Sequence, residues 1–271
     1  MARAIGWQVR SRVSDRPRTI EVPDGLKLRC YPRSGPASNV HYFTPFHDPA
    51  EMAIMASVIG PGDHVADLGA NIGTYTLLMA RMVGPTGRVV AAEPAPLAFG
   101  RLVENLALNR MDHVDPRRVA VGAHAGTASM VTHRDVSNHL VEGGSGAAEV
   151  ELTTLDALAG EHRLAFVKID VEGYEEDVLR GGVRTLASRP TLLLELDDRL
   201  LARAGSSSGA VLERLSTGGY EVLEPVVEPG GAARLVPLEG SRRRNVVAVS
   251  QDEPVLLARL KKGVETLQAI S

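Results

Sequence analysis

The chain has 271 residues, of which 44% are hydrophobic and 23% are charged, and its formal net charge is −3. This composition is typical of a globular protein rather than a disordered or membrane-embedded chain, and the charge gives no support to binding of polyanions. The length suits one large α/β domain with a substantial core.

The first 47 residues are expected to form an N-terminal arm and a small β hairpin. The stretch TIEVPDGLKLRCYP alternates apolar and polar residues around a Pro23–Gly25 turn, a pattern typical of two short antiparallel strands. The aromatic stretch NVHYFTPF, residues 39–46, is expected either to fold over a ligand as a lid or to cover the edge of the core.

The compartment is predicted from three features of the chain. The N-terminus shows no apolar stretch of the secretory type, and no run approaches the roughly 18 apolar residues of a membrane span. The single cysteine, Cys30, cannot form an intramolecular disulfide and is interpreted as structural. We therefore expect a soluble, cytoplasmic protein.

Residues 48–271 are expected to form one Rossmann-like α/β domain. A first helix is predicted after Asp48, with Pro49 at its first position. Strands and helices then alternate, which predicts a doubly wound, mostly parallel sheet of about seven strands. The predicted strands are 63–68, 88–93, 117–121, 165–170 and 191–196, and the predicted helices are 73–82, 96–108, 175–186 and 209–217.

Two stretches depart from this alternation. Residues 128–155 contain two short β-like pieces around a glycine-rich segment, which predicts an insertion over one end of the sheet. Later in the chain, GGYEVLEPV and RRRNVVAVS are predicted to end the sheet as an antiparallel pair, before a terminal helix at 255–269.

The stretch VADLGANIGTYTLLMA, residues 65–80, predicts a strand, a glycine turn and a helix, the place where an open α/β sheet binds ligands. Its glycine spacing does not match G-x-G-x-x-G, and Asp67 would repel a pyrophosphate, so a nicotinamide-dependent oxidoreductase is disfavoured. Glu93 ends the next predicted strand, where an acidic side chain can accept both hydroxyls of a ribose. Together these features predict a nucleoside pocket without a phosphate cradle, which suits S-adenosylmethionine.

At these residues the chain resembles the class I methyltransferases, and the wider pattern is similar to the FkbM-type family. The matching segments lie between Gly60 and Leu196 and include VVAAEPAPLAFGRLVENLALN and FVKIDVEGYEEDVLRGG. The resemblance implies S-adenosylmethionine-dependent O-methylation of a sugar, polyketide or other natural product. It places the methionine part of the cofactor among Asp67, Gly69, Asn71 and Gly73, the ribose at Glu93, and the adenine near Val121 or Gly122.

The segment KIDVEGYEED supplies the candidate chemistry at the acceptor end. Lys168 and Asp170 share one face of a predicted strand, and Glu172 follows in the loop. The two carboxylates could provide a general base or hold a divalent metal, with Glu195 and Asp197 as further carboxylates. A metal is not expected, because carboxylates at strand ends commonly cap helices or pair with arginines.

Two candidate residues have more than one interpretation. Lys168 lies on an apolar strand and needs a partner such as Asp170 or Glu195, so a structural ion pair and a catalytic role both fit the sequence. His139, within the expected insertion, is a candidate general base or a surface histidine.

The sequence thus predicts an enzyme that methylates a hydroxyl group of a small molecule, with no nucleic-acid or membrane partner and with the oligomeric state open. The nearest alternative is transfer to a carboxylate or an amine. A protein that binds S-adenosylmethionine without turning it over is an alternative of a different class.

Overall fold

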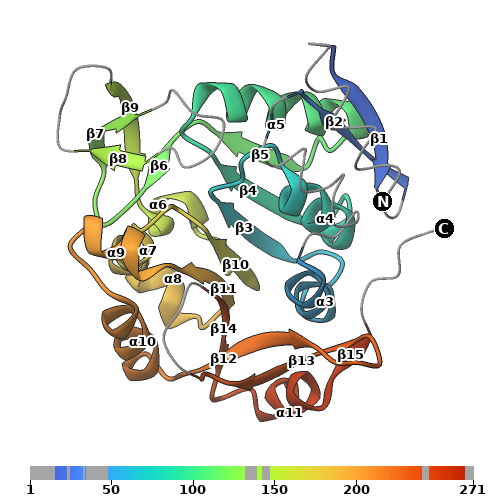
Figure 1. Cartoon of the computed structure of the whole chain (residues 1–271), viewed down its shortest axis with the longest axis vertical. Helices are drawn as coiled ribbons and strands as arrows, with labels where there is room; N and C mark the ends of the chain where they lie inside the picture. Colours follow the sequence, from blue (N-terminus) through green and yellow to red (C-terminus); the bar gives the residue numbers. More distant parts are fainter. Residues whose placement is uncertain are drawn as a thin grey trace.

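The computed structural model describes residues 16–22, 25–32, 34, 48–131, 139–141, 147–239 and 244–265, with the backbone alone at 131, 139–141, 147 and 244. Its main sheet contains β3 (His64–Leu68), β4 (Arg88–Ala92), β5 (Val114–Arg117), β10 (Phe166–Ile169), β11 (Thr191–Leu196), β12 (Tyr220–Val227), β13 (Ala232–Pro237), β14 (Arg244–Ser250) and β15 (Val264–Glu265). The strand order is β15-β13-β12-β14-β11-β10-β3-β4-β5 (Figure 1).

The main sheet has a parallel half and an antiparallel half. Strands β11, β10, β3, β4 and β5 run parallel. Strand β14 lies between β11 and β12 and is antiparallel to both, and β13 and β15 continue the antiparallel edge. Because the carboxyl ends of parallel strands meet at one edge of a sheet, the residues that follow β3, β4 and β10 lie there together.

Helices cover both faces of the main sheet (Figure 1). They are α3 (Pro49–Val58), α4 (Thr74–Val83), α5 (Pro96–Asn109), α6 (Leu155–Ala159), α7 (Glu175–Arg180), α8 (Val183–Ala187), α9 (Asp198–Arg203), α10 (Ser208–Thr217) and α11 (Pro254–Lys262). In β3, Val65 packs with α3, α4 and α5, whereas Ala66 and Leu68 pack with α6, α7 and α10. Successive side chains of a strand point to opposite faces, which explains why these strands are apolar almost throughout.

Two smaller sheets flank the main one. They are formed by β1 (Arg18–Val22) and β2 (Leu26–Cys30), and by β6 (Ala120–Val121), β7 (Gly126–Val131), β8 (His139–Val141) and β9 (Ala147–Thr153). The second of them has the order β6-β9-β7-β8. It packs through Met130 and Val150 against Ala95 and Ala98 at the start of α5, and it therefore lies beside the carboxyl edge of the main sheet.

The β1–β2 hairpin is attached to α5 by two asparagines. The backbone N–H groups of Lys27 and Arg29 donate to the side-chain oxygens of Asn109 and Asn105, both at 2.7 Å. The side-chain amide of Asn105 also donates to the carbonyl oxygen of Ile72 at 2.9 Å. Asn105 and Asn109, four residues apart, lie on the same face of α5 and bind the N–H groups of alternate residues of β2. Asn105 also connects the hairpin to the glycine turn.

The predicted fold class is confirmed, and the main sheet is larger than expected because β13 and β15 extend it. The predicted strand at 117–121 is wrong. The strand beside β4 ends at Arg117, and residues 120–121 belong to the second sheet. Pro116 is tolerated inside β5 because β5 is an edge strand, whose outer side needs no backbone donor.

The helix predicted at 175–186 is two helices, because the chain breaks at Gly181 and Gly182. A Cβ on Gly181 would lie 2.1 Å from the carbonyl oxygen of Gly122, so the chain passes too close to the neighbouring segment for a longer side chain. The terminal helix predicted at 255–269 is too long, because the helix ends at Lys262 and Val264–Glu265 form β15 instead. Residues 266–269 and the stretch 39–46 lie outside the described residues. None of the described helices is both long and apolar enough to span a bilayer.

Candidate active site

The turn between β3 and α4 requires glycine for conformation and for space. Gly69 has a φ of +82°, and a Cβ there would lie 1.8 Å from the carbonyl oxygen of Asp170. Gly73 has a φ of +93°, and a Cβ there would lie 2.7 Å from Leu102. Such φ values are uncommon for residues with a side chain. The glycine turn and the end of β10 therefore pack directly against each other.

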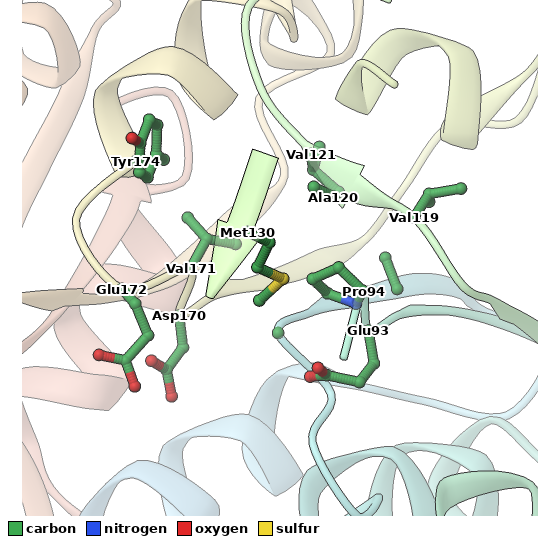
Figure 2. A pocket seen from close by; sticks show the side chains of 12 residues that line it. Glu93, Pro94, Val119, Ala120, Val121, Met130, Asp170, Val171, Glu172 and Tyr174 are labelled. Carbon is green, nitrogen blue, oxygen red and sulfur yellow. The ribbon is translucent and has the colours of Figure 1, made fainter. Parts of the chain in front are cut away.

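A cavity opens at this edge of the main sheet, between the glycine turn and the β6–β9–β7–β8 sheet. Its empty space, counted together with its part open to solvent, is about 480 Å³. Figure 2 shows the residues around it, with carboxylates on two sides. Its lining residues are Gly69, Ala92, Glu93, Pro94, Val119, Ala120, Val121, Met130, Asp170, Val171, Glu172 and Tyr174.

Glu93 follows β4 and is only 6% exposed. Its Oε2 accepts the backbone N–H of Asn71, and its Oε1 accepts that of Ala95, both at 2.9 Å. Burial raises the pKa of Glu93 to about 7, although these two hydrogen bonds act in the opposite direction. Each carboxylate oxygen has a further lone pair, so Glu93 can accept hydroxyl hydrogen bonds while it holds the turn.

Asp67 lies beneath the glycine turn, fully buried, and is not part of the cavity wall. The hydroxyl of Thr76 donates to its Oδ2 at 2.6 Å, and Nζ of Lys168 lies 4.0 Å from its Oδ1. That Oδ1 has no hydrogen-bond partner among the described residues. Burial raises the pKa of Asp67, against the attraction of Lys168. Asp67 thus links α4 to β10 under the turn.

Lys168 is buried on β10 between two carboxylates. Its Nζ donates to Oδ2 of Asp170 at 3.0 Å and lies 4.9 Å from the centre of the Tyr75 ring. Burial lowers the pKa of Lys168, but the attraction of Asp170 and Asp67 outweighs burial, and the pKa lies above its ordinary value. Lys168 is therefore a cation at neutral pH, and the ion pair with Asp170 that the sequence allowed is present.

The opposite wall of the cavity is apolar. Val119, Ala120 and Val121 precede or form β6, and Met130 reaches the cavity from β7 (Figure 2). Sequence reasoning placed Val121 here but missed Met130. No local pattern marks Met130, because its approach depends on the β6–β9–β7–β8 sheet folding back beside α5.

The loop between β10 and α7, residues 170–174, forms the remaining side of the cavity. Glu172 has a φ of +55° and Gly173 a φ of +105°, and a Cβ on Gly173 would lie 2.5 Å from the carbonyl oxygen of Leu200. Figure 2 shows the carboxylates of Asp170 and Glu172 on the same side of this loop. The structure thus brings these two predicted residues together at the cavity.

Glu175, which sequence reasoning did not single out, holds the β10–α7 loop from behind. Its Oε1 accepts the backbone N–H groups of Val171 at 3.2 Å and of Gly173 at 3.1 Å. It is 2% exposed, and burial raises its pKa to about 7. Its position inside KIDVEGYE was visible in the sequence, but the groups that it binds were not.

The remaining predicted residues are more peripheral. His139 is the first residue of β8, and its side chain lies outside the described residues. Asp197 caps α9 by accepting the backbone N–H of Arg199 at 2.9 Å and pairs with the Arg199 guanidinium, while Glu195 is close enough to raise the pKa of Lys168. In the part of the chain that the structure describes, no three His, Cys, Asp or Glu side chains are grouped as metal ligands.

Five of the six predicted cofactor residues line the cavity or shape the turn behind it, whereas the sixth, Asp67, lies beneath the turn. Gly69, Glu93 and Val121 line the cavity. Asn71 and Gly73 shape the turn behind it: Asn71 has a φ of +50° and gives its backbone N–H to Glu93, and Gly73 precedes α4. Contact of Asn71 and Gly73 with a ligand stays a prediction.

Comparison with known proteins gives consistent results. The methyltransferase FkbM domain matches residues 67–222. The methyltransferase sdnD of Sordaria araneosa is 29% identical over 154 residues, covering 43% of this chain and 59% of that protein. The hexuronic acid methyltransferase AglP of Haloferax volcanii is 30% identical over 139 residues, covering 49% of this chain and 56% of that protein. The chain thus spans little more than half the length of either relative.

Among solved structures, the SAM-dependent O-methyltransferase of Thermotoga maritima is similar with a TM-score of 0.41 and 17% sequence identity. The similar region covers 86% of this chain and 77% of that one.

Proposed function

The chain belongs to the FkbM methyltransferase family, and on that premise we propose that it transfers the methyl group of S-adenosylmethionine to a hydroxyl group of a small molecule. The observation that carries this proposal is the composition of the cavity. Buried Glu93 stands beside an apolar wall, and the carboxylates of Asp170 and Glu172 lie across from it. Glu93 and the apolar wall suit a nucleoside. The carboxylates of Asp170 and Glu172 suit an acceptor hydroxyl that must lose a proton.

In this proposal the adenine of the cofactor would lie at the apolar wall and its ribose at Glu93. Val121 and Met130 would contact the adenine, and Glu93 would accept the ribose hydroxyls through its remaining lone pairs. The methionine part would extend along Gly69, where the backbone is accessible because no side chain intervenes. When bound, S-adenosylmethionine supplies an electrophilic methyl group on a sulfonium. Asp67 contributes indirectly, by holding the turn from below.

The acceptor would lie against the β10–α7 loop. We assign the general base to Glu172, because its carboxylate lies at the cavity beside that of Asp170 (Figure 2). The carboxylate of Glu172 would take the hydroxyl proton as the acceptor oxygen bonds to the methyl carbon and the carbon–sulfur bond breaks toward sulfur. Asp170 would orient the acceptor, and Lys168, which is buried outside the cavity lining, would hold Asp170 in its charged form.

The proposal is tested first by calorimetric titration with S-adenosylhomocysteine. Saturable binding is expected for the wild type, with a loss of affinity of at least about tenfold in Glu93→Ala, which removes the charged acceptor. Glu213→Gln, an exposed change on α10, is the matched control and should bind as the wild type does. Absence of binding by folded wild-type protein, or binding of reduced nicotinamide in its place, would contradict the proposal.

The acceptor class is tested next with labelled methyl donor and a panel of hydroxylated sugars and polyketides. Glu172→Gln is expected to lose activity by about 10²-fold or more, as general-base removal does. A carboxylate acceptor needs no base, so full activity of Glu172→Gln would assign a carboxyl acceptor instead. Cofactor binding without turnover on any acceptor would favour a catalytically silent binding protein.

A further inference from the structure

Resting on the proposed function, we propose that Glu175 is a positioning residue that sets the conformation of the β10–α7 loop and thereby places Glu172 at the acceptor. Glu175 lies outside the cavity lining and is 2% exposed. It therefore acts through the loop rather than by touching a substrate.

A single carboxylate oxygen of Glu175 binds both sides of Glu172. Oε1 accepts the N–H of Val171, the residue before Glu172, and the N–H of Gly173, the residue after it. These two donors belong to a loop with no helix or strand pairing of its own, and a buried N–H without an acceptor is costly. The two hydrogen bonds consequently fix the direction of the chain on either side of Glu172.

The conformation that these bonds hold is an uncommon one. Glu172 has a left-handed φ of +55°, which residues with a side chain seldom adopt and which persists only where the surroundings determine it. Gly173, next in the chain, is left-handed as well and packs against the carbonyl oxygen of Leu200. With Glu175 on one side and Leu200 on the other, the loop turns so that the Glu172 carboxylate lies beside that of Asp170 (Figure 2).

Hydrogen-bond acceptance, rather than charge, is the property that this role requires. Burial raises the pKa of Glu175 to about 7, and the nearby Asp170 carboxylate adds to the effect. Its second oxygen, Oε2, has no hydrogen-bond partner among the described residues and is the oxygen that would carry the proton. Oε1 accepts hydrogen bonds in either protonation state, so a glutamine should replace Glu175 where an alanine cannot.

The test compares Glu175→Gln with Glu175→Ala by amide hydrogen exchange, followed by NMR on the full chain. In Glu175→Ala, exchange of the Val171 and Gly173 amides should accelerate at least about tenfold, whereas Glu175→Gln should keep both within about threefold of the wild type. Asp177→Ala, a partly exposed change on the same helix, should leave both amides unchanged. Equal protection in wild type and Glu175→Ala, or equal loss in both variants, would overturn the proposal.

A second readout keeps the test decisive if Glu175→Ala does not fold. In the wild type the amide shifts of Val171 and Gly173 should titrate together near neutral pH, and this titration should vanish in Glu175→Gln while both amides stay protected. The amides of Asn71 and Ala95 report the separate titration of Glu93 and should be unaffected. Persistence of the titration at Val171 and Gly173 in Glu175→Gln would refute the assignment.

Neither readout needs an acceptor, so the proposal about Glu175 can fail or succeed separately from the proposed function. Once an acceptor is identified, Glu175→Ala should lower kcat or raise the acceptor KM at least about tenfold, with S-adenosylhomocysteine affinity within about threefold. Glu175→Gln should restore the activity. Activity lost equally in both variants would show that charge rather than positioning is required.

Discussion

Replacement of Lys168 by methionine should destabilise the fold, because it leaves a buried carboxylate without its cation. Lys168 Nζ lies 4.0 Å from the fully buried Asp67, a separation worth about 4 kcal/mol at an effective dielectric constant of about 20. The attraction to Asp170 adds less, because that side chain is 37% exposed and solvent screens it. Methionine does not carry the cost of burying a charge that Lys168 carries, and this offsets part of the loss. We therefore expect Lys168→Met to lower the free energy of unfolding by about 3 kcal/mol near neutral pH.

This loss should grow with pH. Burial already raises the folded-state pKa of Asp67 above its ordinary value, and removal of Lys168 would raise it further. An acid with a raised folded-state pKa costs no stability below its unfolded-state pKa, and the cost develops as the pH rises toward and through the folded-state pKa. The variant should therefore lie closest to the wild type in acid, where Asp67 is protonated in both.

Urea denaturation followed by circular dichroism, at about pH 5, 7 and 8.5, measures the free energy of unfolding of each form. Lys261→Met is the matched control, because Lys261 also pairs with a carboxylate, that of Glu221, but at the surface. It should cost less than about 1 kcal/mol. The reasoning is refuted if Lys168→Met costs no more than Lys261→Met, or if its cost does not depend on pH.

Three further predictions concern the turn and the hairpin. The affinity for S-adenosylhomocysteine should fall as the pH drops below about 7, because Glu93 becomes protonated; calorimetry should show this slope in the wild type and none in Glu93→Gln. Gly69→Ala should cost about 3 kcal/mol or more, since its Cβ would meet a backbone oxygen at 1.8 Å. Gly205→Ala, with a φ of +76° and open space, should cost less, and equal costs in urea denaturation would contradict the steric explanation. Asn105→Leu should cost about 1–3 kcal/mol, because it leaves the buried carbonyl oxygen of Ile72 and the part-buried N–H of Arg29 unpaired. Asn109→Leu, which removes hydrogen bonds that are exposed to solvent, should cost less; the reverse order would exclude this role for the asparagines.

The sequence was sufficient for the parallel half of the sheet and for one side of the cavity. Strands that are buried on both faces are apolar throughout, so β3 and β11 were found within a residue of their observed bounds. Glu93 and Asp170 were found because each directly follows such a strand, and parallel strands bring their carboxyl ends together. These are local patterns with a known spatial consequence.

The remainder depends on contacts between segments that no local pattern connects. Met130 reaches the cavity only because the β6–β9–β7–β8 sheet folds beside α5. The predicted strand at 117–121 missed the strand at Val114–Arg117, because the edge position that tolerates Pro116 became evident only from the strand order. Glu175 carries no periodic signal, because its partners are backbone N–H groups, which every residue type except proline provides.

The position of β14 has a consequence for how the chain folds during synthesis. Strand β14 is inserted between β11 and β12, so β12 and β13 have no backbone ladder to the parallel half until residues 244–250 have left the ribosome. Domains generally fold as units while synthesis proceeds, and pairings between distant segments form slowly. Until β14 arrives, the outer edge of β11 is an unpaired apolar strand of the kind that promotes aggregation. A truncation before residue 244 would leave that edge open permanently.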